Sequence, residues 1–225
     1  MILLILTTTY FVKLYFNEQD CLKKNFIWLN DEHSCIDIGY GKTKAEMDIQ
    51  IIGDALFKEQ ITKALYLLQY KSPDTFEYPK KYIKIIKQVK NGYSGMKAWI
   101  EKPTFLMSNS SAFYSLTWAA SSIVHDSYHS YLYHTYKQNN PNKKVPYKVL
   151  WAEQEAELKC NMLAVQSLED MHAPNHEIVH VKSGDGKHGD LNGDGKYNTK
   201  EDKKLRAERI NSRNIKSTQK DKTNL

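Results

Sequence analysis

Two pairs of histidines in this chain combine the spacing that a metal site on a helix requires with an acidic residue directly after the first histidine. His125 and His129 lie four residues apart, and so do His176 and His180. Residues i and i+4 share one face of an α-helix, so both imidazoles of a pair can reach one zinc ion. In each pair an acidic residue follows the first histidine and could accept a proton from water. Each pair is therefore a candidate hydrolytic metal centre.

The second pair matches a zinc-protease motif more closely than the first, but the residues around it are less favourable to a long helix. The segment NHEIVHVK (175–182) contains His-Glu-x-x-His, the signature of many zinc proteases. Only Ala-Pro-Asn precedes the motif, and Gly184 ends any helix one turn later. In the extended signature HExxHxxGxxH, Gly184 comes one residue late and His188 two residues late. We therefore expect this segment to be a connector without a metal.

The first pair lies inside a long helical pattern. Apolar residues precede His125 and His129, and the pattern predicts a helix from about residue 111 to 137. A second helix is expected over about 149–171, where Glu157 and Asn161 lie one turn apart on one face. Glu157 follows His129 by 28 positions. A second helix laid across the first could bring Glu157 to the metal as a third ligand.

This arrangement resembles the gluzincin metallopeptidases, which carry HExxH on one helix and a ligand glutamate on a later one. Glu157, Cys160 and Asn161 match the Glu, small and Asp/Asn positions of the ExxAD or ExxAN pattern of that group. The stretch 78–202 is also similar to an uncharacterised bacterial group with an SGM segment, a His-Asp-x-x-His helix and an Asp-Gly calcium-type loop.

The resemblance implies a zinc ion held by His125, His129 and Glu157, with water in the fourth position. It implies that Asp126 is the general base and that Asn161 orients a ligand histidine from behind. The chain departs from the family at Asp126, where gluzincins carry glutamate. Aspartate is one methylene shorter, so its reach toward the water is in question.

A second metal motif follows at DLNGDGKYNTKE, residues 190–201, which matches the twelve-residue EF-hand loop. The oxygen ligands at positions 1, 3, 5, 7, 9 and 12 are Asp190, Asn192, Asp194, the Lys196 carbonyl, Asn198 and Glu201. Gly195 stands at position 6, where the chain must turn sharply. Position 8 is Tyr197 instead of an aliphatic residue, and the chain has a single complete loop. We expect a structural calcium site and not a switch.

The rest of the chain predicts strands and helices around these motifs. Residues 1–52 look strand-rich, with Ala45, Met47, Ile49 and Ile51 alternating on one face. Asp54 can cap a helix whose apolar residues are Leu56, Ile61, Ala64, Leu65 and Leu68. SPDTF should break it, and a second helix should bury Tyr82, Ile83, Ile86 and Val89. MKAWI and TFLMS are short strand candidates.

These elements predict an α+β fold of minimal gluzincin-like type with an active-site helix and a Glu helix. Residues 1–183 form the expected metallopeptidase-like domain, strand-rich over 1–52 and helical over 54–183. Residues 184–212 form the EF-hand-like calcium-binding segment. Residues 213–225 form a basic tail that we expect to be disordered.

Composition limits the partners. The 225 residues are 41% hydrophobic and carry a net charge of +6. The densest basic run is C-terminal and lacks an aromatic stacking platform, so nucleic acid is not expected. The N-terminal MILLILTTTYFV is too short to span a bilayer. It fits either a secretory signal or a strand.

The cysteines and the calcium loop bear on the compartment. Cys21 and Cys35 could form a disulfide in an oxidising compartment, whereas Cys160 is expected to be a small buried residue. A single EF-type loop works best at the millimolar calcium found outside cells. These features favour an extracytoplasmic or secreted location, although a cytoplasmic one stays open.

The expected function is hydrolysis of peptide bonds in a peptide or protein substrate by a zinc-dependent, metallopeptidase-like site with Asp126 as base. The alternative is a non-catalytic extracellular calcium-binding or interaction module on the same scaffold, for example a toxin-related domain. The sequence fixes neither the substrate nor the oligomeric state.

Overall fold

The computed structural model describes residues 48–146 and 153–186, the helical residues 200, 201, 204, 205 and 208, and the backbone of two short strands. These strands, β1 (Ile27–Leu29) and β2 (Ser34–Ile36), pair antiparallel. Several sequence predictions lie outside the described residues: the character of residues 1–20, the disulfide of Cys35 with Cys21, calcium-loop positions 190–198, and the tail 213–225.

A four-stranded sheet lies at one end of the molecule, with the strand order β3-β4-β6-β5. Its strands are β3 (Gln50–Ile52), β4 (Ile85–Val89), β5 (Gly95–Lys97) and β6 (Thr104–Ser108). Strands β3, β4 and β6 are parallel, and β5 is antiparallel to β6. Ile86 of β4 lies opposite Phe105 of β6, and both side chains are fully buried. The predicted strand TFLMS is confirmed as β6, whereas only the start of MKAWI belongs to a strand.

The predicted second helix is wrong in its C-terminal half. Helix α3 (Pro73–Tyr82) begins at SPDTF, where Pro73 takes the first helical position that its fixed φ favours. The chain is extended at Ile83, and β4 follows. Ile86 and Val89 fit helical spacing, but β-branched side chains suit a pleated strand and β4 pairs with strands on both sides. Pairing with distant strands overrides the local period.

Helix α2 (Ala55–Lys71) begins where predicted. Asp54 is its N-cap, and the Asp54 carboxylate accepts a hydrogen bond of 3.0 Å from the Phe57 backbone N–H. Of the apolar residues named for this helix, Leu56 is 71% exposed, while its neighbour Phe57 is fully buried. The other four, Ile61, Ala64, Leu65 and Leu68, are buried.

The long helix α5 (Leu116–Asn139) lies at the centre of the helical half and packs against α2, α3 and α7 (Gln154–Asp170). It follows the short α4 (Asn109–Ala112). Ala119 and Ala120 are fully buried, and side chains this small let neighbouring helices approach closely. The buried Ser130 hydroxyl donates to the Tyr82 carbonyl at 2.8 Å and ties α5 to the end of α3. The predicted helices 111–137 and 149–171 thus exist, with the first divided near Ser115.

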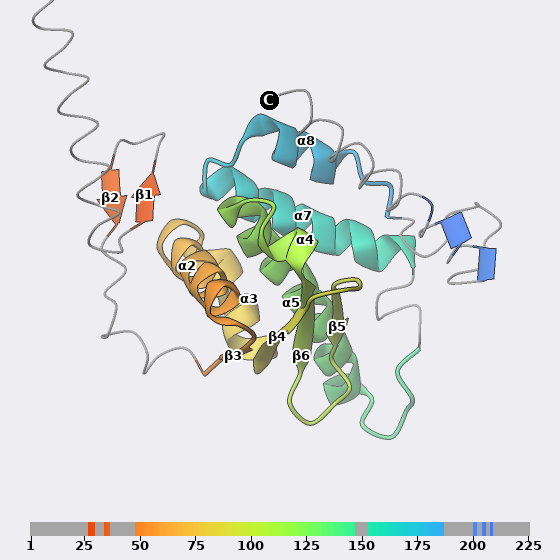
Figure 1. Ribbon diagram of the computed structural model, residues 1–225. Coiled ribbons are helices and arrows are strands. Elements are labelled where there is room, and N and C mark those ends of the chain that lie inside the picture. The colour runs from red at the N-terminus through yellow and green to blue at the C-terminus, as the bar shows by residue number, and fades with distance from the viewer. Residues whose placement is uncertain are drawn as a thin grey trace, which may run out of the picture.

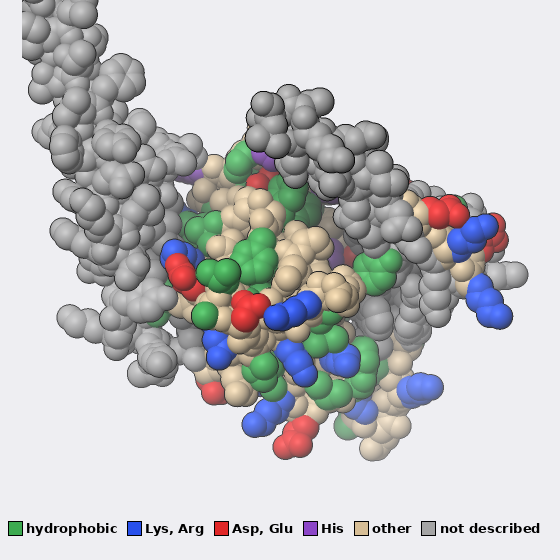
Figure 2. Space-filling model, viewed as in Figure 1, with side chains coloured by type: hydrophobic (Ala, Val, Ile, Leu, Met, Phe, Trp, Pro, Cys, Tyr) green, Lys and Arg blue, Asp and Glu red, His purple; other side chains and the backbone are tan. Residues whose placement is uncertain are grey.

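Helix α8 (Asn175–Lys182) packs on α7, and Figure 1 shows the two running side by side above α4 and α5. The same view in space-filling form shows the Lys and Arg side chains mainly over the sheet end of this face, with acidic side chains among them (Figure 2). The described part of the chain is a mixed α+β fold, in agreement with the predicted class. None of its helices is long and apolar enough to cross a membrane.

Candidate metal centre

His125, His129 and Glu157 meet where α5 crosses α7. The Nε2 atoms of His125 and His129 lie 3.2 Å apart. The two carboxylate oxygens of Glu157 lie 3.2 Å from Nε2 of His125 and 3.5 Å from Nε2 of His129. The structure therefore brings together the three residues that the sequence predicts as zinc ligands.

Each helix positions its donor for a local reason. Helix α5 places His125 and His129 one turn apart, and their rings meet with centroids 4.9 Å apart. Glu157 lies in the first turn of α7, where the positive end of the helix dipole favours a carboxylate. The donors differ in access, because the His125 side chain is 18% exposed while those of His129 and Glu157 are each 6% exposed. An incoming molecule would therefore approach from the His125 side.

The cluster also determines the charge of Glu157. Burial acts to raise the pKa of the Glu157 carboxyl, but hydrogen bonds and positive charge from His125 and His129 outweigh it. The pKa of Glu157 is therefore lowered from its ordinary value, and the carboxylate is negative at neutral pH. Two imidazoles and one carboxylate in this arrangement offer the donor types that zinc uses in hydrolytic sites.

Cys160 is a fourth member of the cluster. Its Sγ lies 3.4 Å from Nδ1 of His129, whereas the other ring nitrogen, Nε2, faces Glu157. His125, His129 and Cys160 form a group whose donor atoms could hold a metal ion. Burial raises the pKa of the Cys160 thiol well above its ordinary value. The sequence did not lead us to expect Cys160 in the cluster. Its position three residues after Glu157, on the same helical face, is the signal that could have indicated it.

Asp126, the expected general base, is buried on α5 and follows His125 directly in the chain. Burial raises the pKa of its carboxyl to about 7; the positive charge of His125 acts in the opposite direction, and the negative charge of Glu157 adds to the increase. The carboxyl group thus lies close enough to both residues to respond to their charges. Among the described residues, no hydrogen bond reaches the Asp126 side chain.

Asn161, expected to orient a ligand histidine, lies on α7 with its amide towards the end of α8. A Cβ atom placed on Gly184 would lie 3.0 Å from the Asn161 amide nitrogen. Nδ1 of His129 lies 3.4 Å from Sγ of Cys160. The role expected of Asn161 stays a prediction.

The histidines of HEIVH lie elsewhere. His176 and His180 are exposed on α8, where their rings pack near Tyr114 and Trp118 respectively. Glu177 between them is 2% exposed, and its carboxylate accepts a hydrogen bond of 2.7 Å from the Thr117 hydroxyl of α5. The acidic residue of this motif anchors α8 to the core. Within the described chain, the pair belongs to no group of three metal-donor side chains.

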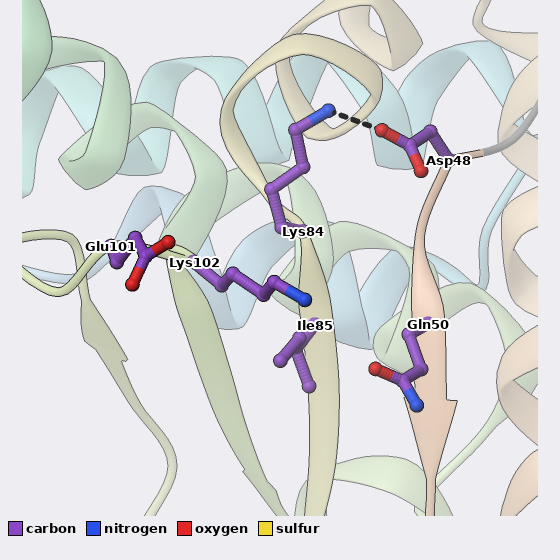
Figure 3. Close-up of a pocket in the computed structure, with 6 residues that line it drawn as sticks. All are labelled: Asp48, Gln50, Lys84, Ile85, Glu101 and Lys102. Atoms are coloured by element: carbon purple, nitrogen blue, oxygen red, sulfur yellow. Dashed lines mark hydrogen bonds and ion pairs between the residues drawn. The ribbon is translucent and has the colours of Figure 1, made fainter.

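A separate pocket of about 380 Å³ lies at the amino-terminal ends of the parallel strands, lined by Asp48, Gln50, Lys84, Ile85, Glu101 and Lys102. Figure 3 shows Lys84 paired with Asp48, at 2.7 Å, and the Lys102 side chain extending toward β4 near Ile85. None of its lining residues comes from α5 or α7. The pocket mixes exposed charges of both signs and is distinct from the histidine cluster.

Of the predicted calcium ligands, only Glu201 is among the described residues, where it is helical and exposed. Asp190, Asn192, Asp194, Lys196 and Asn198 lie outside them. The calcium site stays a prediction from the sequence.

Comparison of the chain with protein-family models, curated proteins and solved structures finds no match. The resemblance to gluzincins thus rests on the quoted motifs alone. Function has to be argued from the geometry and chemistry of the histidine cluster.

Proposed function

We propose that the chain is a zinc-dependent hydrolase of the metallopeptidase type, with His125, His129 and Glu157 as the protein ligands. One observation carries the proposal: donor atoms from these three residues converge with separations of 3.2, 3.2 and 3.5 Å. Tetrahedral ligands about 2.0–2.1 Å from zinc would lie about 3.3–3.4 Å from one another. The two Nε2 atoms thus have this spacing, and each lies a similar distance from one of the two Glu157 carboxylate oxygens.

The donor types favour zinc over calcium at this cluster. Calcium takes six to eight oxygen ligands, whereas two of the three donors here are imidazole nitrogens. Imidazole suits zinc and other late transition metals, and two histidines with one glutamate are the ligand set of several zinc hydrolases. Three protein ligands leave a fourth position open, which distinguishes catalytic from structural zinc sites.

In this proposal each residue has a separate task. Bound zinc would polarise the scissile carbonyl and make water a better nucleophile at neutral pH. Asp126 receives the proton of the attacking water, and it adjoins His125, the most accessible ligand. Glu157 supplies negative charge to the site. His129 is the buried histidine ligand, on the side away from solvent. The substrate class is a peptide or protein, approaching past His125.

The first test is metal content. Purified protein should contain one zinc ion per chain by elemental analysis, and His125→Ala or Glu157→Ala should lose it. The matched controls are His176→Ala and His180→Ala, which alter the same residue type at the same spacing on α8. The wild-type protein should be dialysed against zinc, and the excess should then be removed. If the folded protein then contains no zinc, the proposal is refuted.

The second test is turnover. Wild type, Asp126→Glu and Asp126→Ala should be compared on a peptide library in their zinc-loaded forms. Loss of the general base should lower the rate by about 10²–10⁴-fold in Asp126→Ala. Asp126→Glu should keep measurable activity, because it restores the residue usual in gluzincins.

A second candidate function is a non-catalytic module in which zinc supports the fold. The near-complete burial of His129 and Glu157 favours it, because structural sites are closed to solvent. Zinc binding without turnover by wild type or Asp126→Glu would select this reading. Removal of zinc would then unfold the domain instead of only inactivating it.

A further inference from the structure

Cys160 has a position that the proposed zinc chemistry does not yet use. Its side chain is fully buried, and its sulfur lies 3.4 Å from Nδ1 of His129. We propose that Cys160 is a positioning residue: its sulfur accepts the Nδ1–H of His129 and holds the opposite nitrogen, Nε2, toward the metal. This inference rests on the zinc site proposed above and adds how that site is oriented.

The ring proton of a histidine determines which of its two nitrogens can bind a metal. A histidine that binds metal is neutral and carries one ring proton, on the nitrogen that does not face the metal. Nε2 of His129 faces both His125 and Glu157, so with a metal bound at Nε2 the ring proton would be on Nδ1. Sγ of Cys160 lies 3.4 Å from that nitrogen. A sulfur atom is larger than oxygen, so 3.4 Å is a hydrogen-bonding distance for N–H···S.

Two helices fix this contact. His129 is on α5 and Cys160 is on α7, 31 residues later, within the same crossing that brings Glu157 to the histidines. Glu157 and Cys160 lie one turn apart on α7, so one helix face contacts both nitrogens of His129. Metal-ligating histidines almost always donate their second ring proton to an acceptor, which here is a thiol instead of a carboxylate or carbonyl.

Cys160 could instead bind the metal directly, and the geometry argues against that role. Its sulfur lies on the Nδ1 side of the His129 ring, while His125 and Glu157 lie on the Nε2 side. The donor atoms of His125, His129 and Cys160 all lie within 4.8 Å of one another, so the test has to separate ligation by the thiol from a positioning role. The separations of 3.2–3.5 Å among the two Nε2 atoms and the Glu157 oxygens favour a metal on the Nε2 side.

The experiment compares Cys160→Ala and Cys160→Ser with wild type. Cys160→Ala removes the acceptor, and zinc affinity, measured by competition with a chromophoric chelator, should fall by about 10–100-fold. Cys160→Ser keeps an acceptor of smaller size and should recover part of the affinity. Ser167→Ala is the control for packing, because Ser167 is also a fully buried polar residue of α7 and donates within its own helix, to Ala164.

Cobalt substitution separates a positioning role from direct ligation. Co²⁺-loaded wild type should show the visible bands of a four-coordinate site without the near-ultraviolet band of a cobalt–thiolate bond. NMR of the zinc-loaded protein should show a protonated Nδ1 on His129, with a resonance that moves in Cys160→Ala. Variants that merely loosened the fold would not produce this specific change.

Three outcomes would overturn the inference. Zinc affinity unchanged in Cys160→Ala would show that the contact is packing alone. A thiolate band in wild type that disappears in Cys160→Ser would make Cys160 a ligand. Failure of the wild type itself to bind zinc would refute both the inference and the proposed function. The first two outcomes leave zinc binding by His125 intact, so the two kinds of failure are distinguishable.

Discussion

The Glu157 carboxylate of α7 lies 3.2 Å from Nε2 of His125 on α5, and this contact joins the two helices that form the centre of the molecule. Neither residue can reach the other unless the helices cross at this point. The same carboxylate extends to His129 at 3.5 Å. Metal binding and the packing of α5 on α7 are therefore coupled, since both depend on one buried side chain.

Replacing Glu157 with glutamine tests this coupling. Glu157→Gln keeps the size of the side chain and removes its charge, so zinc affinity should fall by more than the roughly 100-fold expected for a residue behind a ligand. Competition with a chelator measures the affinity. Glu169→Gln is the control, since Glu169 is an exposed glutamate of the same helix that pairs with Lys182 at 2.6 Å. Equal affinities in the two variants would contradict the assignment of Glu157.

The contact between Thr117 and Glu177 gives a second prediction. Thr117→Val removes the donor to a buried carboxylate and should lower the free energy of unfolding by about 1–3 kcal/mol. Zinc content should not change, because this carboxylate anchors α8 and lies outside the histidine cluster. Urea denaturation and elemental analysis measure the two effects. Loss of zinc in Thr117→Val or Glu177→Gln would show that HEIVH takes part in the metal site.

Elements determined by neighbouring residues could be predicted from the sequence. Elements determined by contacts with distant parts of the chain could not. Helix α2 follows from its Asp54 cap, and β6 from a compact apolar run. Strand β4 could not be recognised, because Ile86 also fits a helical period and the deciding contacts are with β3 and β6. Leu56 and Phe57 are neighbours, and only the packing of α2 decides which one is buried.

The same distinction holds for the histidine cluster. His125 and His129 are recognisable from spacing within one helix, and Glu157 from a resemblance in the next. The contact of Cys160 with His129 depends on how α7 is rotated against α5, which no spacing within one helix reveals. The exact match of HEIVH to the zinc-protease motif is misleading as a metal-site prediction for the same reason. Letters do not show that Glu177 turns inward to Thr117 while His176 and His180 stay exposed.

His134 predicts how stability depends on pH. Burial lowers the pKa of the His134 imidazole from its ordinary value, and among the described residues its buried Nε2 has no hydrogen-bond partner. The unfolded chain therefore binds a proton more readily than the folded protein does. The contribution of His134 is favourable above its ordinary pKa of about 6.5 and is lost as pH falls from there through the lower folded value.

His134→Phe should remove this dependence and keep the stacking on Tyr82. Chemical denaturation in chelator at several pH values between about 5 and 8 should show a smaller loss of stability toward acid than in wild type. At the acid end the variant should be more stable than wild type, because it has no buried imidazole to protonate. The other histidines titrate in both proteins, so their effect cancels in the difference between the two free energies of unfolding. Parallel pH profiles would show that His134 is equally accessible to protons in both states.

The calcium loop gives a prediction that is independent of the zinc site. If residues 190–201 bind calcium through the six oxygen positions of an EF-hand, calcium should raise the melting temperature of wild type. At a free calcium concentration 100 times the dissociation constant, the stabilisation is about 2.7 kcal/mol. Asp190→Ala removes the first ligand and should abolish the increase. In chelator, the variant and wild type should have the same melting temperature, because the loop contributes to stability only through the bound ion.

Asp185→Ala is the control, since it removes a carboxylate from the preceding segment outside the twelve positions. An equal change in melting temperature with calcium and with chelator would make Asp190 a residue of the fold and refute the calcium site.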